Sequence, residues 1–317
     1  MSADNRTLFL VYNRISGRSG LLGRRAGQVR AVVNWFARRG WAVEPHALPR
    51  AHWDGAAGTV IPPVLPAFDA NKYRAVIAAG GDGTIHWVAN ALLSRGVDLP
   101  LAVLPWGTSN DYAANLNIWA HQPLEKLLDN ILNALTAGRF VYFDVGEAGD
   151  RYFINLLGFG LLTNVAYEVH PRYKNTLGRL AYILHAVSNL NSYRPFELTI
   201  ATPEGERREK LLLVLVQNGV AGGGFKRIAP RASCCDGLFD VVGFRAVPWL
   251  KMWSLVRLVL AGKQVEDPAV VYFQADRLEL AADRLLATTM DGERGPDLPL
   301  AVTVHPRRLR LLLPVGD

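Results

Sequence analysis

The sequence has few of the residues that build disulfide-bonded or zinc-binding proteins. Its two cysteines, Cys234 and Cys235, are adjacent in a chain of 317 residues, and its seven histidines show no metal-ligand spacing. Adjacent cysteines suit neither a structural disulfide nor a zinc site, so both are predicted to be small buried residues.

Long apolar runs are absent as well. No segment reaches the roughly 18 uninterrupted apolar residues of a membrane span, and residues 1–6 lack the apolar stretch of a signal peptide. We therefore expect a cytoplasmic protein. Low-complexity tracts are also missing. With 50% hydrophobic and 20% charged residues, the chain has the composition of a folded protein. Its length favours two domains.

Acidic residues are fewer than basic ones, with 28 against 35, so the formal net charge is +7. This charge predicts an anionic partner, and nucleic acid, an anionic membrane and a phosphorylated ligand all fit. A cluster of early arginines fits either a solvated helix face or a role at a phosphate or lipid surface. Its members are Arg14, Arg18, Arg24, Arg25, Arg30, Arg38 and Arg39.

The first part of the chain alternates strands and helices. Short apolar strands are predicted at residues 8–12, 74–79 and 101–104, and helical spacing follows at 27–39 and 85–92. This order predicts an α/β domain, a parallel sheet with helices on both faces. Ligands of such a sheet bind beyond the carboxyl ends of its strands.

From about residue 141 the pattern changes to strands separated by glycine and proline. An antiparallel, β-rich second domain is expected over residues 144–305, after a first domain of residues 1–143, to which a last strand at 306–317 returns. Two helices interrupt the strands, at 178–190 and 249–261. The predicted strands are 152–157, 196–201, 211–217, 238–244, 277–281 and 308–313.

The most informative segment is the Gly-Gly-Asp-Gly-Thr turn at residues 80–84, which joins a buried strand to an amphipathic helix. Glycines expose backbone N–H groups, and the helix dipole attracts an anion to the same point, so the turn predicts phosphate binding. Asp82 would repel phosphate unless it holds Mg²⁺ or orders water there. A strand-to-helix connection with Asp and Thr as caps is the structural alternative.

Two more polar turns follow predicted strands of the same sheet, at residues 13–20 and 105–111. Asp82 and Asp111 each follow the carboxyl end of a strand, where their carboxylates could jointly order one Mg²⁺ and its waters. For Thr108 and Asp111, a capped helix start without a ligand is the alternative.

Five motifs together resemble one family. They occur in the order seen in diacylglycerol kinase catalytic domains of the bacterial soluble type. The motifs are residues 80–84, residues 107–111, the stretch from Asn218 to 228–230, Asp236-Gly237 and residues 291–293. These proteins are related to sphingosine and ceramide kinases and more distantly to NAD kinase. The resemblance spans nearly the whole chain. It implies an ATP- and Mg²⁺-dependent lipid kinase with a β-sandwich second domain and a nucleotide cleft between the domains.

The resemblance also implies site residues. Asp291 would be the catalytic base, supported by Glu293, although Asp291-Gly292 alone could be a plain β-turn. Asp236 would hold a structural Mg²⁺ together with backbone carbonyls, although Asp236-Gly237 could be a hairpin turn. The N–H groups of Gly81, Gly83 and Thr84 would cradle the phosphates. The expected nucleotide-binding residues are Asn13, Ser16, Gly17, Gly80, Gly81, Asp82, Gly83, Thr84, Gly107, Thr108 and Asn110.

The acceptor is most simply a diacylglycerol, converted to phosphatidic acid. A ceramide or sphingoid-base kinase is the near alternative. NAD kinase is disfavoured for two reasons. The Gly-Thr-Ser-Asn-Asp turn at residues 107–111 stands where NAD kinases have an Asn-Glu pair, and the Asp-Gly-Glu motif is present at residues 291–293. The last alternative is a non-catalytic nucleotide- or lipid-binding regulator.

The segment at residues 249–260 is apolar almost all round, with Lys251 and Arg257 near its ends. It is either a core helix or an interfacial helix whose tryptophans lie at the level of the lipid headgroups. We expect a membrane lipid as substrate, a transient and peripheral association with the membrane, and no nucleic-acid partner. The sequence leaves the oligomeric state open, with a homodimer as one option.

Overall fold

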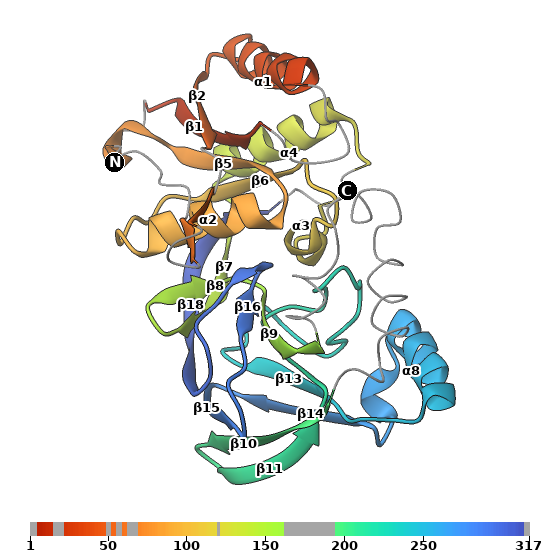
Figure 1. Cartoon of the computed structure of the whole chain (residues 1–317). Coiled ribbons are helices and arrows are strands. Elements are labelled where there is room, and N and C mark those ends of the chain that lie inside the picture. Colours follow the sequence, from red (N-terminus) through yellow and green to blue (C-terminus); the bar gives the residue numbers. More distant parts are fainter. Residues whose placement is uncertain are drawn as a thin grey trace. The chain divides into compact units, whose positions relative to one another are not determined.

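The computed structural model describes residues 5–14, 22–48, 52–54, 59–61, 69–118, 121–161 and 194–313. The chain forms two compact units (Figure 1). The N-terminal unit comprises Met1–Phe143 and Arg307–Asp317, and the C-terminal unit comprises Asp144–Pro306. The chain therefore crosses from one unit to the other twice.

A parallel sheet with helices forms the N-terminal unit. Its strand order is β2-β1-β5-β6, and the end of β18 joins β6 in parallel through Leu311 and Leu101. Helices α1 and α4 contact each other, as do α2 and α3. The elements are β1 (Thr7–Asn13), α1 (Leu22–Ala37), β2 (Ala42–Leu48), β3 (His52–Asp54), β4 (Thr59–Ile61), η1 (Ala70–Lys72), β5 (Ala75–Gly80), α2 (Asp82–Leu93), β6 (Leu101–Pro105), α3 (Asp111–Asn115) and α4 (Leu124–Ala137).

Burial explains why these segments take their conformations. Every residue of β5 is buried, as expected for a parallel strand that is covered on both faces. Helix α2 buries Ile85, Val88, Ala89 and Leu92, the positions that the helical spacing predicted. The predicted α/β organisation of this part of the chain is confirmed.

Antiparallel sheets form the C-terminal unit. One has the strand order β14-β13-β12-β9-β16-β17, and the other joins β11, β10, β15 and the first part of β18. The elements are β7 (Phe140–Ala148), β8 (Arg151–Phe153), β9 (Leu156–Gly160), β10 (Phe196–Thr202), β11 (Gly205–Leu211), β12 (Leu213–Gln217), β13 (Phe239–Phe244), α8 (Trp249–Ala261), η3 (Gln264–Glu266), β14 (Val270–Ala275), β15 (Arg277–Ala282), β16 (Thr288–Met290), β17 (Glu293–Arg294) and β18 (Leu300–Leu312).

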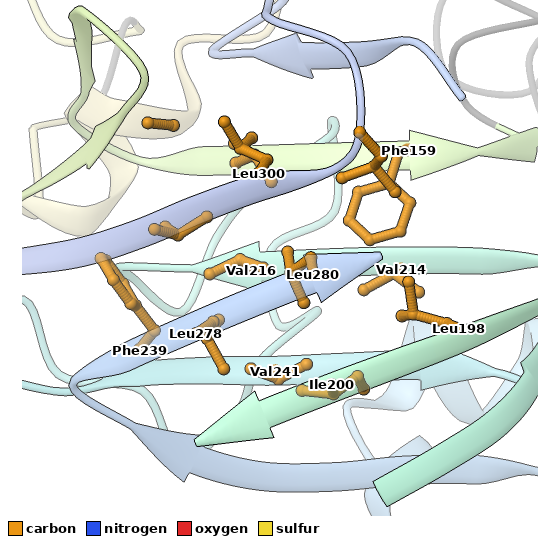
Figure 2. Packing of buried hydrophobic residues seen from close by; sticks show 14 of the residues in the cluster. Phe159, Leu198, Ile200, Val214, Val216, Phe239, Val241, Leu278, Leu280 and Leu300 are labelled. Carbon is orange, nitrogen blue, oxygen red and sulfur yellow. The ribbon is translucent and has the colours of Figure 1, made fainter. Parts of the chain in front are cut away.

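The two sheets share one hydrophobic core. Figure 2 shows Val214, Val216 and Val241 from the first sheet packed with Ile200 and Leu278 from the second. On the other face of the first sheet, a second core cluster includes Leu255 and Val259 of α8. The expected antiparallel, β-rich second domain is confirmed.

Several predicted boundaries differ from the structure. The strand predicted at 152–157 is divided into β8 and β9, because Ile154 and Asn155 form the break described below. The strand predicted at 211–217 contains the end of β11 and all of β12, and the strand at 308–313 is the end of the longer β18. The helix predicted at 178–190 lies outside the described residues. In the part of the chain that the structure describes, no helix is long and apolar enough to cross a membrane.

Candidate active site

The glycine turn connects β5 to α2. Gly80 ends the strand, and Gly81 is the N-cap of α2, a twelve-residue helix that begins at Asp82. Thr84 is only 3% exposed, and its Oγ1 has no hydrogen-bond partner among the described residues. A Cβ atom at Gly80 would lie 2.1 Å from this Oγ1, so the site requires glycine. The start of α2 therefore combines a residue without a capping side chain and a buried hydroxyl without a partner.

One detail differs from the expected phosphate cradle. The backbone N–H of Thr84 donates to the carbonyl of Gly81 at 2.9 Å. This donor is therefore used within the turn, and Thr84 can offer a ligand its hydroxyl instead.

A second turn connects β6 to α3. Asn110 is buried, has a left-handed backbone with φ of 54°, and closes the turn with its own amide. The N–H of Gly107 donates to Asn110 Oδ1 at 2.9 Å, and Asn110 Nδ2 donates to the carbonyl of Gly107 at 3.0 Å. Thr108 lies on the exposed side of the turn. Asn110 therefore shapes this turn, while Thr108 is open to solvent.

The two turns are in direct contact. The N–H of Trp106 donates to the carbonyl of Gly80 at 2.8 Å, and a Cβ atom at Gly107 would lie 2.3 Å from the Cα of Gly81. Strand register places Gly80 opposite Pro105 in neighbouring parallel strands. The structure thus brings together the two polar turns that the sequence placed at one edge of the sheet.

Asp82 and Asp111 lie at the starts of two adjoining helices. Asp82 Oδ1 accepts the N–H of Tyr112, the residue after Asp111, at 2.9 Å. Mg²⁺ is usually bound by one or two carboxylates plus substrate phosphates, and this pair fits that donor set. Within the described ranges no group of three or more His, Cys, Asp or Glu side chains gathers for a metal. The pair therefore suits a metal that arrives with phosphate, rather than a cage made by protein alone.

The third polar turn follows β1, the neighbour of β5. Tyr12 pairs with Ala79, so Asn13 lies at the same edge of the sheet as Gly80. Ser16 and Gly17 lie outside the described residues, and their expected role stays a prediction.

Sequence reasoning did not find the contact between Arg25 and Trp106. Arg25, from α1, is 4% exposed and donates through Nη2 to the carbonyl of Trp106 at 3.2 Å and through Nη1 to Gln28 Oε1 at 2.9 Å. Its guanidinium carbon lies 4.9 Å from the centroid of the Trp106 ring. Burial lowers the pKa of Arg25. The early arginine cluster was the available signal, but it did not identify which arginine is buried or its partner.

Asp291 occupies a tight turn in the C-terminal unit. With φ of 51° at Asp291 and 93° at Gly292, the residues join β16 to β17 as in a type I′ hairpin. The Asp291 carboxylate accepts three backbone N–H groups, from Ile154 at 2.8 Å, Asn155 at 2.9 Å and Leu156 at 2.8 Å. These bonds fix the orientation of the carboxylate and cause the break between β8 and β9. Glu293 is half-buried at the start of β17.

Asp236 belongs to the same unit and is exposed. Its Oδ1 accepts the N–H of Leu238 at 3.2 Å, and the next residue, Gly237, donates its N–H to Oδ2 of the buried Asp144 at 2.7 Å. Asn218 Nδ2 donates to the carbonyl of Asp144 at 2.7 Å. The structure therefore places Asp236 in a turn that Asp144 anchors in the C-terminal unit. Asp82 and Asp111 belong to the N-terminal unit.

The adjacent cysteines lie before this turn. Neither forms a disulfide, and both are half-buried rather than fully buried as predicted. Burial raises the pKa of the Cys234 thiol, so its reactive thiolate form is disfavoured.

Comparisons with known proteins agree with this organisation. Residues 7–148 match the diacylglycerol kinase catalytic domain, and residues 158–313 match the YegS C-terminal NAD kinase beta sandwich-like domain. The chain is 30% identical over 305 residues to a diacylglycerol kinase of Bacillus subtilis strain 168, covering 96% of this chain and 95% of that protein. It is 28% identical over 229 residues to a diacylglycerol kinase of Staphylococcus epidermidis strain RP62A, covering 72% of this chain and 71% of that protein.

The fold is also found in a solved structure. A diacylglycerol kinase from Bacillus anthracis strain Sterne superimposes with a TM-score of 0.73 at 19% identity, covering 98% of each chain. Together, the two matched domains and the diacylglycerol kinases among the relatives define an enzyme of the lipid kinase class. Kinases of this class take their phosphoryl group from ATP. The chain belongs to the diacylglycerol kinase family.

Proposed function

We propose that this chain transfers the γ-phosphoryl group of ATP to the primary hydroxyl of a diacylglycerol, producing phosphatidic acid at a membrane surface. The proposal rests on the buried Thr84 hydroxyl at the start of α2, which has no hydrogen-bond partner among the described residues. A buried hydroxyl without a partner costs free energy in the ligand-free protein, and a phosphate oxygen at this helix start would supply its missing partner.

The nucleotide-binding residues follow from this placement. The glycine turn supplies the N–H groups of Gly81 and Gly83 and the hydroxyl of Thr84, while Thr108 offers an exposed hydroxyl from the adjoining turn. Asn110 and Gly80 shape the two turns. Asn13, with Ser16 and Gly17, would complete the phosphate side from the turn after β1.

Mg²⁺ would be held by Asp82 and Asp111 and would neutralise charge on the nucleotide phosphates. Asp236 is exposed and stays a predicted ligand of a structural Mg²⁺, together with backbone carbonyls, beside the buried Asp144 whose Oδ2 accepts the N–H of Gly237. The proposed chemistry does not depend on a metal there.

Asp291 would orient the acceptor hydroxyl and take its proton. A bond forms between that oxygen and the γ-phosphorus while the bond from the γ-phosphorus to the bridging oxygen breaks. Phosphoryl transfer depends mainly on positioning, and the three N–H groups that fix the Asp291 carboxylate serve that need. Glu293, two residues later, would support this group.

The replacement Thr84→Val tests the nucleotide site, because valine keeps the shape of threonine without its hydroxyl. Ligand-free Thr84→Val should be as stable as the wild type or about 1 kcal/mol more stable, and its KM for ATP should rise roughly tenfold. Denaturant unfolding and ATP kinetics measure the two effects.

The matched control is Thr288→Val. Thr288 is also buried, but its Oγ1 donates to the carbonyl of Pro296 at 2.6 Å, so this variant should lose stability and keep its KM for ATP. Equal destabilisation of both variants with an unchanged KM for ATP would contradict a phosphate role for Thr84. A panel of diacylglycerol, ceramide, sphingosine and NAD as acceptors tests the substrate.

A further inference from the structure

Helix α8 exposes an apolar face. Leu255 and Val259 are buried in the core of the C-terminal unit, yet Leu250 is 69% exposed and Leu260 67% exposed. Trp253, between them, is 42% exposed. Positions 250, 253, 257 and 260 are separated by three or four residues and therefore share one side of the helix. A helix that packs on the core of a soluble protein normally presents polar residues to solvent on its outer side. The exposed apolar residues of α8 therefore indicate an interaction surface.

The charged residues of helix α8 are all basic. Helix α8 contains no Asp or Glu in thirteen residues, and Arg257 is exposed between Trp253 and Leu260. At the end of the helix, the exposed Arg227 lies against Gly262, where a Cβ atom would meet the Arg227 side chain at 3.0 Å, and Lys263 is exposed beside it. Lys251 pairs with Asp267 at 3.2 Å, and Glu266 is the exposed acidic residue nearby in the chain.

These observations favour a lipid surface. A helix of thirteen residues is about 20 Å long, too short to span a bilayer, but an amphipathic helix of this kind can lie in the plane of the interface. Leucine side chains would enter the acyl region, tryptophan would lie at headgroup level, and arginine would extend to the phosphates. The positive charge selects a bilayer that contains anionic lipids.

We propose that the exposed face of α8, formed by Leu250, Trp253, Arg257 and Leu260, docks the enzyme on an anionic lipid bilayer. The proposal rests on the proposed function, because a kinase whose acceptor is a bilayer lipid must reach that acceptor at the membrane. The proposed face shares no residue with the two turns proposed to bind nucleotide in the N-terminal unit.

Vesicle sedimentation tests the docking face. Wild-type protein should bind vesicles containing phosphatidylglycerol more tightly than vesicles of phosphatidylcholine alone. Replacing Leu250→Gln and Leu260→Gln should weaken binding about tenfold each. Arg257→Gln should remove part of the preference for phosphatidylglycerol and part of the salt dependence. The matched control is Leu285→Gln, because Leu285 is 77% exposed in the same unit but lies outside α8.

Two outcomes overturn the proposal. One is binding that the α8 variants leave unchanged or that Leu285→Gln weakens equally. The other is a wild-type dimer in solution that the α8 variants convert to monomer without any change in vesicle binding, since a second copy of the chain would then be the occupant.

A second assay separates this proposal from the proposed function. A short-chain diacylglycerol dispersed as monomers needs no membrane, so the α8 variants should phosphorylate it at the wild-type rate while losing activity on vesicles. If the wild type phosphorylates no diacylglycerol in either form, the proposed function fails, and the sedimentation result still decides whether α8 docks on lipid.

Discussion

Gly107→Ala is the substitution that tests most sharply how the glycine turn and the turn after β6 fit together. An alanine Cβ there would lie 2.3 Å from the Cα of Gly81 and 2.7 Å from Asn110 Oδ1. Carbon atoms in contact normally lie about 3.5–4.0 Å apart, so the turns must separate by roughly 1 Å. Both neighbours are held, Gly81 by the backbone of the helix start and Asn110 by its two hydrogen bonds to Gly107. The strain cannot be relieved by rotating a flexible side chain.

The expected cost follows from that displacement. Overpacking of this kind destabilises proteins by about 1–3 kcal/mol. A shift of about 1 Å in groups that position a substrate costs on the order of a hundredfold in rate. We therefore expect Gly107→Ala to lower the free energy of unfolding by about 1–3 kcal/mol and kcat/KM for ATP about a hundredfold. Denaturant unfolding and initial-rate kinetics measure these quantities.

Gly27→Ala is the control, because a Cβ atom at this position in α1 meets no atom within 4 Å. Alanine is a better helix former, so this variant should gain up to about 1 kcal/mol of stability with unchanged kinetics. If Gly107→Ala keeps both its stability and its kcat/KM for ATP, the contact between the turns does not constrain the site, and the reasoning is refuted.

Three further predictions concern other positions. Glu293→Gln should lower kcat by roughly tenfold or more, with little change in the free energy of unfolding. An unchanged kcat would show that Glu293 takes no part in the proposed chemistry. Arg25→Met should raise KM for ATP and lower the free energy of unfolding by about 1–3 kcal/mol, because the carbonyl of Trp106 loses a charged donor; an unaltered KM with normal stability would contradict this role. Burial raises the pKa of the Asp240 carboxyl in the folded protein above its value of about 4 in the unfolded chain. The stability that the protonated carboxyl contributes is therefore fully present below about pH 4 and is lost as pH rises through the pKa of the folded state. Thermal melts of Asp240→Asn should therefore show a weaker decline from acid to neutral pH, and a profile identical to that of the wild type would refute the burial argument.

The parts of the fold that the sequence predicted correctly are those that local pattern determines. The buried run of β5, the glycine turn and the spacing of Ile85, Val88 and Leu92 in α2 are all local signals, and the structure has each of them. Helix α4 had an equally clear pattern, with Leu127, Leu128, Ile131, Ala134 and Leu135 buried before a left-handed Gly138, and attention to that spacing could have found it.

The remaining features depend on contacts between distant residues. The break between β8 and β9 arises because Asp291, more than a hundred residues later, takes the N–H groups of Ile154, Asn155 and Leu156. Nothing in the local sequence of that strand announces the break. Arg25 and Trp106 are likewise 81 positions apart, so no spacing rule could pair them. The motifs drew attention to the two turns, but only the folded chain shows the hydrogen bonds of Asn110 within its turn and of Asp82 to the N–H of Tyr112.

The Asp291 bonds also limit how a substitution there can be interpreted. Asp291→Ala would leave three buried N–H groups without their acceptor, and each such loss costs roughly 1–3 kcal/mol. Loss of activity in that variant would therefore reflect folding as well as chemistry. Glu293→Gln, which keeps the size of the side chain, is the cleaner probe of the same loop.

The most direct test of the central claim is to identify the phosphorylated product. Purified wild-type protein is incubated with ATP labelled in its γ-phosphoryl group, Mg²⁺ and a total lipid extract, and the labelled product is identified by mass spectrometry. We expect the label to appear in phosphatidic acid. Label in phosphorylated ceramide or a sphingoid base, formation of NADP when NAD is supplied, or the absence of any labelled lipid would contradict it.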